Sequence, residues 1–254
     1  MGPMGAGPVV GGGMRGAPIT FARQNTSKRV LEVKWDFPVY TPPEQPKGQQ
    51  SEHTVAAQVA EALPEEQAFA WISRTDKRPL LVLRECDSCK GTDDALLSRS
   101  MNNDETRMLL RWFHCVKLPV HVMKAGHPFH QLFDGEHPPH LFLCDPDGGS
   151  AATFDGGQTQ SGLKQVMYEM LKRHYTKDPR QAIREMHKLL SHYDHLDSRE
   201  VEIRDRLDNE IERNGPKSPK VAEIERDLAE IDKQRKAAKA KEQQLCDLGL
   251  KAGS

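Results

Sequence analysis

The chain has 254 residues, and its 36 basic and 37 acidic side chains leave a net charge of -1, which provides no field to attract nucleic acid or an anionic membrane. Hydrophobic residues make up only 37% of the chain, so we expect part of it to lie outside a folded core. No apolar run approaches the roughly 18 to 20 residues that span a bilayer, and the N-terminus lacks the apolar centre of a secretory signal. We therefore expect a soluble, cytoplasmic protein with neither a nucleic-acid nor a membrane partner.

Residues 1–53 are predicted to form a flexible Gly/Pro-rich tail that contains one short structured segment. The first residues are rich in glycine and proline and too poor in apolar side chains to offset their ordering entropy. Between residues 30 and 40 the alternation is that of a strand with one apolar face, formed by Leu31, Val33, Trp35, Phe37 and Val39. Because Pro38 cannot donate to a ladder, this segment is either an edge strand docked on the following domain or a peptide that extends a partner's sheet.

Residues 54–178 have the alternating helical and strand patterns of an α/β domain. The predicted elements are a helix after Pro64, a strand at 79–83, a helix after Asp104, strands at 116–122, 141–144 and 151–154, and an amphipathic helix around 163–171.

Residues 179–254 are dominated by charged side chains and are predicted to form an antiparallel helical hairpin, or coiled coil. The first helix starts at Pro179 and ends before Asn214-Gly215-Pro216, and the second starts at Pro219. We define the hairpin seam as the apolar residues at coiled-coil spacing, namely Leu196, Ile203, Leu207, Val221, Ile224, Leu228 and Ile231. The hairpin should project from the domain, and its seam either closes on itself or also pairs with a second copy to give a homodimer.

Cys86 and Cys89 follow the predicted strand at 79–83 and would open the next helix. A helix N-terminus stabilises a thiolate, and a second cysteine one turn away can resolve a mixed disulfide. The same spacing also forms half of a zinc site, but the sequence contains no second CxxC. Cys115 and Cys144 are expected to be small core residues, whereas Cys246 lies near a helix end.

With these residues the chain resembles the thioredoxin-like superfamily over about 54–175. The resemblance rests on the CDSCK motif after a strand and on HPPHLFLCDPDG at 137–148, which is similar to the family segment where a cis-proline precedes a strand and a D-x-D-G turn. It implies an α/β three-layer sandwich with Cys86 as nucleophile, Cys89 as resolving thiol, and Pro139, preceded by Pro138, as the substrate platform. The implied activity is that of a protein-disulfide oxidoreductase, which exchanges thiols with protein dithiols or disulfides and needs no cofactor.

The sequence departs from the family pattern around the cysteines. Glu85 stands where the family has tryptophan, and Asp87 and Ser88 replace Gly-Pro, while Leu80 occupies the position of a buried acid. The two carboxylates oppose formation of a Cys86 thiolate. The alternative function is a non-catalytic scaffold that uses the hairpin for partner binding or dimerisation.

Four histidines suggest a further alternative, a metal-handling thioredoxin relative. His127, His130, His137 and His140 form two H-x2-H pairs whose neutral imidazoles could bind zinc or copper. Solvated loop histidines explain the pattern more simply, so no metal is assigned.

Overall fold

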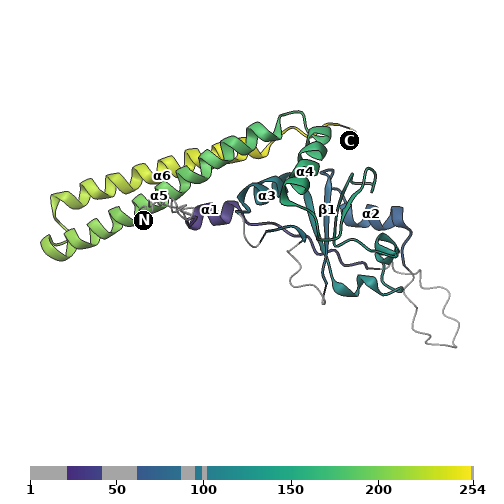
Figure 1. Cartoon of the computed structure of the whole chain (residues 1–254). Helices are drawn as coiled ribbons and strands as arrows, with labels where there is room; N and C mark the ends of the chain where they lie inside the picture. The colour runs from purple at the N-terminus through teal and green to yellow at the C-terminus, as the bar shows by residue number, and fades with distance from the viewer. Residues whose placement is uncertain (1–21, 42–61, 87–94, 99–101, 253–254) are drawn as a thin grey trace, which may run out of the picture.

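A computed structural model of the protein describes residues 22–41, 62–86, 95–98 and 102–252. A body of sheet and helices carries two long antiparallel helices that project from one side (Figure 1). The α/β class and the C-terminal helical pair are therefore confirmed. Among the described helices, none combines the length and the apolar character needed to cross a bilayer.

The elements follow one another in this chain order: α1 (Asn25–Val30), α2 (Glu65–Ser73), β1 (Leu80–Arg84), α3 (Asp104–Leu109), the 3-10 turn η2 (Leu110–Trp112), β2 (His114–Leu118), the 3-10 turns η3 (Val120–Met123) and η4 (His130–Phe133), β3 (Leu141–Cys144), β4 (Ala152–Phe154), α4 (Gln160–His174), α5 (Pro179–Asn214) and α6 (Pro219–Cys246).

The strands form a mixed sheet in the order β2-β1-β3-β4. Strand β1 runs parallel to β2 and antiparallel to β3, so Leu81 lies opposite both Cys115 and Leu143. Strands β3 and β4 form an antiparallel hairpin. All five residues of β1 are buried, which agrees with the continuous apolar run expected of a central strand covered on both faces.

Alternate side chains of β1 enter two hydrophobic cores on opposite faces of the sheet. Leu81 and Leu83 belong to the larger core, together with residues of α3, α4 and α5. Leu80 and Val82 belong to the smaller core, which also contains residues of α2 and η4. Helical elements therefore cover both faces of the sheet (Figure 1).

Most predicted elements of residues 54–178 are confirmed, but β2 is displaced toward the N-terminus. The prediction was a strand at 116–122, whereas β2 ends at Leu118 and η3 follows. Pro119 has no N–H to continue the ladder, so the pairing stops there. The predicted helix opened by the cysteines runs over 87–94, which lie outside the described residues, and on to Leu96 and Leu97, which are described and are not in an α-helix.

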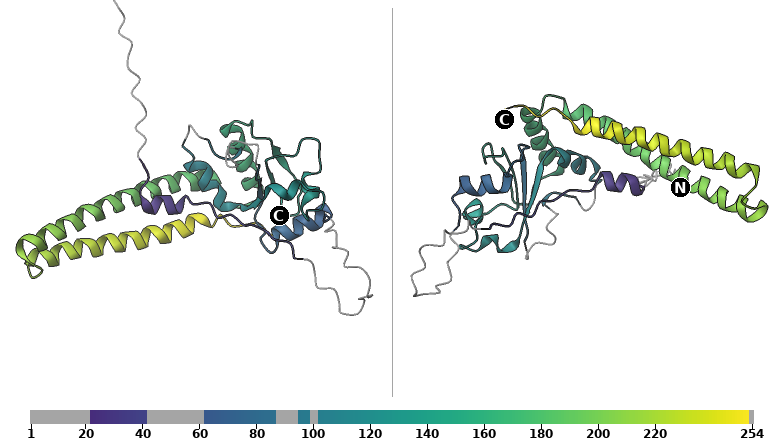
Figure 2. Two further views of the ribbon diagram at one scale, coloured as in Figure 1. Left: turned by 90° about the horizontal axis from the view of Figure 1, so that it is seen from below. Right: turned by 180° about the vertical axis from the view of Figure 1, so that it is seen from behind.

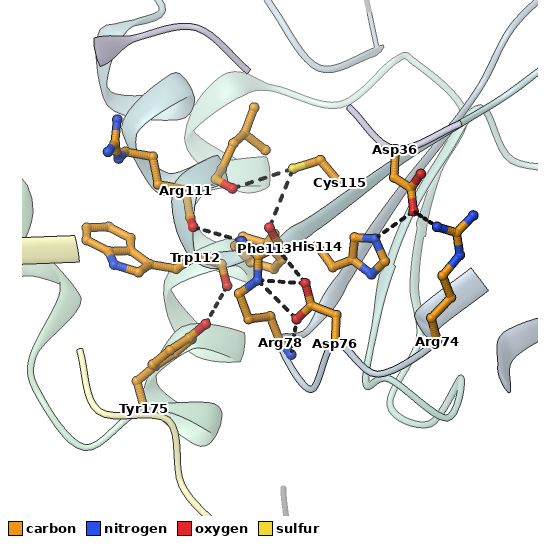
Figure 3. A network of polar contacts seen from close by, with 11 residues as sticks. Asp36, Arg74, Asp76, Arg78, Arg111, Trp112, Phe113, His114, Cys115 and Tyr175 are labelled. Atoms are coloured by element: carbon orange, nitrogen blue, oxygen red, sulfur yellow. Dashed lines mark hydrogen bonds and ion pairs between the residues drawn. The ribbon is translucent and has the colours of Figure 1, made fainter. Parts of the chain in front are cut away.

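The segment around Asp36 docks on the free edge of β2, as the edge-strand prediction proposed. Its backbone pairs with β2 at one position only: Asp36 N donates to Cys115 O at 2.8 Å, and Asp36 O accepts from Lys117 N at 2.8 Å. Figure 3 shows the Asp36 carboxylate between His114 and Arg74, at 3.3 and 3.8 Å. The remainder of the predicted strand pairing is absent from this described segment.

The predicted apolar face of this segment is only half buried. Val33 and Trp35 pack on the larger core, but Phe37 and Val39 are 61% and 74% exposed. At its end near Phe37 and Val39 the segment is instead held by Tyr40, whose ring packs on Trp71 with ring centroids 4.9 Å apart. The predicted strand is therefore reduced to one bridge at Asp36, and the core covers only part of its predicted apolar face.

Helix α1 is an element that the sequence pattern does not predict. Its first N–H groups are capped by carboxylates of α5: Gln24 N donates to Asp194 Oδ1 and Thr26 N to Asp197 Oδ2, each at 2.8 Å. The Ser27 hydroxyl donates to the Leu190 carbonyl at 2.9 Å. Helix α1 thus lies along the hairpin (Figure 2), and 22–41 departs from the flexible tail predicted for 1–53, whose other residues are not described.

The cap on α1 makes stability depend on pH. Burial alone would raise the pKa of Asp197, but hydrogen bonds from Thr26 and Arg235 outweigh it and lower this pKa. A carboxyl with a depressed folded pKa stabilises the protein above its unfolded pKa near 4, and this contribution is lost as the pH falls through the folded value. Asp197→Asn should therefore cost about 1 kcal/mol of unfolding free energy at pH 7 and less at pH 3, measured by urea titration.

A control for this prediction is Asp232→Asn, since the Asp232 carboxylate is well exposed and lies 3.6 Å from Arg235. The control should change stability little at either pH. An Asp197→Asn effect of equal size at pH 7 and pH 3 would contradict the assignment.

The helical hairpin matches its prediction closely. Helix α5 ends at Asn214, and Gly215 follows with a φ of +81° that favours glycine. The hairpin seam is closed within the chain, because Leu196, Ile203, Ile224 and Ile231 are buried and Leu207 and Leu228 pack against them. The seam therefore packs on itself within one chain, and its pairing with a second copy stays a prediction.

The base of α5 belongs to the domain as much as to the hairpin. Its first turns contribute to the larger core the residues Ala182, Ile183, Met186, Leu189, Leu190 and Tyr193. Trp112 Nε1 donates to the Cys246 carbonyl at 2.9 Å, which also ties the end of α6 to the body. The hydrophobic core thus continues across the predicted domain boundary at 178/179.

Candidate functional site

The candidate site lies where the parallel strands β1 and β2 end. Carboxyl ends of parallel strands meet at one edge of a sheet, and ligands of open α/β sheets bind at such edges. Glu85 N donates to the Leu118 carbonyl at 2.8 Å, so the pairing continues one residue beyond β1. Cys86 follows directly at this edge, whereas Cys89 lies outside the described residues.

The loop before β3 reaches the same edge. Arg84 N donates to the His140 carbonyl at 2.8 Å, and His140 N donates to the Phe154 carbonyl at 3.0 Å. These bonds extend the β1–β3–β4 pairing to His140. The structure therefore brings Pro138 and Pro139 close to the end of β1.

The predicted cis-proline is wrong. Among the described residues no peptide bond is cis, so the bonds before Pro138 and Pro139 are trans. The loop is held in another way, by the guanidinium of Arg84, whose Nε donates to the Pro139 carbonyl at 3.1 Å and whose Nη2 donates to the Pro138 carbonyl at 3.3 Å. The substrate-platform role depended on a cis bond, and this basis is removed.

Arg84 is the residue of the site that sequence reasoning missed. It is 7% exposed, and its guanidinium lies 5.8 Å from the centre of the Phe133 ring. Burial lowers its pKa. Among the described residues no carboxylate lies within ion-pair distance of it. The one signal in the sequence is an arginine that ends the apolar run before Cys86.

His140 lies beside this guanidinium, with its Nδ1 3.5 Å from Arg84 Nη2. Burial and the charge of Arg84 lower the pKa of His140, and nearby Asp155 opposes them only in part. The imidazole is therefore neutral near pH 7 and adds no second positive charge.

Glu85 points to a different partner. Its Oε1 lies 3.7 Å from Nζ of Lys117, whose ammonium also lies 5.6 Å from the centre of the Trp35 ring. The carboxylate that the sequence placed against a Cys86 thiolate is thus partly balanced by an ammonium group.

A pocket of about 330 Å³ is lined by Glu85, Lys117 and residues of the docked segment. Its other lining residues are mostly apolar or imidazole side chains, namely Phe37, Pro38, Val39, Tyr40, Pro119, His121, His127, Pro128 and Phe129. The exposed side chains of the docked segment therefore stand close to the Cys86 edge.

The four histidines do not form a metal centre. No three His, Cys, Asp or Glu side chains in the described parts of the chain are grouped so as to hold a metal ion. His127 Nδ1 accepts from Phe129 N at 3.1 Å, and His130 Nδ1 lies 3.3 Å from the Val122 carbonyl. Burial, with His121 and His130 nearby, lowers the pKa of His127. The metal alternative therefore finds no support.

The remaining cysteines have the environments that the sequence predicted. Cys115 and Cys144 are buried. Burial raises the pKa of Cys115 to about 12, and it also raises the pKa of Cys144. Both are poor nucleophiles at neutral pH. Cys246 is half-buried and accepts a hydrogen bond from Arg111 Nε at 3.2 Å.

No family model matches the chain, and neither a curated protein nor a solved structure does. The function must therefore be inferred from the residues and geometry around Cys86.

Proposed function

We propose that the protein carries out thiol-disulfide exchange with the Cys86–Cys89 pair on a thioredoxin-like domain. The observation that carries the proposal is the position of Cys86, directly after a buried central strand at the carboxyl edge of a parallel strand pair. The succession of the β1–β2 pair, the β3–β4 hairpin and the closing helix α4 fits such a domain and supports the proposal.

The reaction follows from ordinary thiol chemistry. The Cys86 thiolate attacks one sulfur of a substrate disulfide, and the other substrate sulfur leaves as a thiolate that takes up a proton. The Cys89 thiolate then attacks the Cys86 sulfur of the mixed disulfide. This step releases the second substrate thiolate and leaves a Cys86–Cys89 disulfide, so the substrate is reduced by two electrons and the enzyme is oxidised by two.

A redox titration of the full chain with thiol trapping tests this function. We expect one reversible two-electron couple, and we expect Cys86→Ser to abolish it. Cys246→Ser is the matched control, because Cys246 is half-buried and lies outside the motif, so its replacement should leave the couple unchanged.

Absence of any couple in the biological range of potentials would favour the second candidate function, a non-catalytic scaffold. The observation that favours the scaffold is an exposed apolar side chain on each of two turns of α5, Val201 and Ile211. Exposed apolar groups on an otherwise charged helix can contact a partner. Under this function the hairpin would bind its partner regardless of the state of the cysteines.

A further inference from the structure

We propose that Arg84 is an electrostatic residue of the site, whose uncompensated charge stabilises the thiolate form of Cys86. This inference rests on the proposed function, in which that thiolate is the nucleophile. The first argument is burial without a counter-ion. A buried charge normally has an oppositely charged partner, because its desolvation is otherwise costly.

The hydrogen-bond acceptors of Arg84 carry no net charge. Its guanidinium donates to the carbonyls of Pro138 and Pro139 and lies near a neutral His140 ring. These contacts satisfy N–H groups and orient the side chain, but they leave its positive charge in place. An arginine stays protonated even when burial lowers its pKa.

The charged groups next to Arg84 do not neutralise it. The adjacent carboxylate, Glu85, lies 3.7 Å from the ammonium of Lys117. Neighbouring side chains on a strand point to opposite faces, so Glu85 is directed away from Arg84. The field of the guanidinium at this edge of the sheet is therefore not cancelled by its neighbour.

The position of Cys86 makes that field effective. Residues two apart on an extended strand have Cα atoms about 6.6 Å apart and share a face. The hydrogen bond from Glu85 N to Leu118 O continues the strand pairing between Arg84 and Cys86. At such distances, with the partial screening of a half-buried site, a unit charge shifts the pKa of a thiol by about one unit.

The test measures the pKa of the Cys86 thiol from the pH dependence of its reaction with iodoacetamide. The full chain carries Cys89→Ser and Cys246→Ser. Cys86 is then the thiol that reacts, because the two other remaining cysteines, Cys115 and Cys144, are buried. With Arg84 in place we expect a pKa below the ordinary value near 8.5. Arg84→Met should raise it by about one unit and slow the reaction at pH 7 roughly tenfold.

Arg84→Lys separates charge from position, since lysine keeps the charge but not the forked donors. We expect it to restore most of the wild-type pKa. Arg78→Met is the matched control, because Arg78 precedes β1 at its other end and is paired with Asp76 at 2.6 Å. It should leave the Cys86 pKa unchanged. Asp87, which stands between the two cysteines in the sequence, is present in every variant, so its effect on the Cys86 pKa cancels in the comparison.

An unchanged Cys86 pKa in folded Arg84→Met protein would overturn the inference. Equal shifts of the Cys86 pKa in Arg84→Met and Arg84→Lys would also overturn it, because they would show that Arg84 only positions the loop. Should Arg84→Met fail to fold, Arg84→Gln keeps donors for the proline carbonyls and carries the same expectation. A low pKa without a redox couple would instead refute thiol-disulfide exchange and leave the electrostatic role of Arg84 intact.

Discussion

Deletion of residues 179–254 is expected to unfold the α/β body rather than release it as a stable domain. The base of α5 buries large apolar side chains in the same core as β1, among them Ile183, Met186, Leu190 and Tyr193. Burial of each contributes about 1.5 to 3 kcal/mol, so their loss removes roughly 6 to 12 kcal/mol. This is comparable with the whole stability of a typical domain, about 5 to 15 kcal/mol. Circular dichroism and limited proteolysis of the truncated chain measure the result.

The matched variant shortens the hairpin at its far end. Replacing residues 206–228 with a short Gly/Ser linker removes the tip and keeps the base of α5 and the end of α6. Residues 206–228 carry Leu207, Val221, Ile224 and Leu228 of the hairpin seam but no residue of the larger core. The body should therefore keep its fold and unfold cooperatively at a similar temperature. A stable, folded product from the 179–254 deletion would contradict the shared core, whatever the shortened variant does.

The domain boundary shows what a compositional pattern can and cannot predict. The change to charged sequence after residue 178 identifies the hairpin correctly, and the signals at Pro179, Gly215 and Pro219 locate its helices. Composition averages over all faces of a helix, however, and one apolar stripe at the base of α5 is enough to join it to the core. A change in sequence composition therefore does not have to coincide with the edge of the hydrophobic core.

The candidate site was predicted to a similar extent. The position of Cys86 after a buried strand follows from a local run of apolar residues, whereas the expectation for Pro139 came from the family resemblance alone. The contact of Arg84 with the proline carbonyls joins residues 54 and 55 positions apart. No local period encodes such a pairing, and the same holds for the capping of α1 by Asp194 and Asp197.

Arg111→Met is expected to destabilise the protein by about 2 to 4 kcal/mol, because Arg111 ties three separate elements together. Its Nη2 lies 2.7 Å from Glu242 Oε1 in α6, and its Nη1 donates to the Val30 carbonyl of α1 at 2.7 Å. The two charged side chains are only 25% and 17% exposed. Without Arg111, the hydrogen-bond partner that Glu242 keeps among the described residues is the Tyr193 hydroxyl, which donates at 3.2 Å. Urea unfolding at pH 7 measures the loss.

Two further variants separate the partly buried Arg111–Glu242 pair from exposed ion pairs. Arg204→Met removes an arginine that is 63% exposed and lies 2.7 Å from Glu200, and exposed pairs of this kind contribute at most about 1 kcal/mol. Adding Glu242→Gln to Arg111→Met removes the unpaired, partly buried charge, so the double variant should regain part of the lost stability. Equal losses for Arg111→Met and Arg204→Met, or no recovery in the double variant, would show that Arg111 acts only as one more surface charge. The position of α6 against the body would then depend on apolar packing and on the hydrogen bond from Trp112 to Cys246.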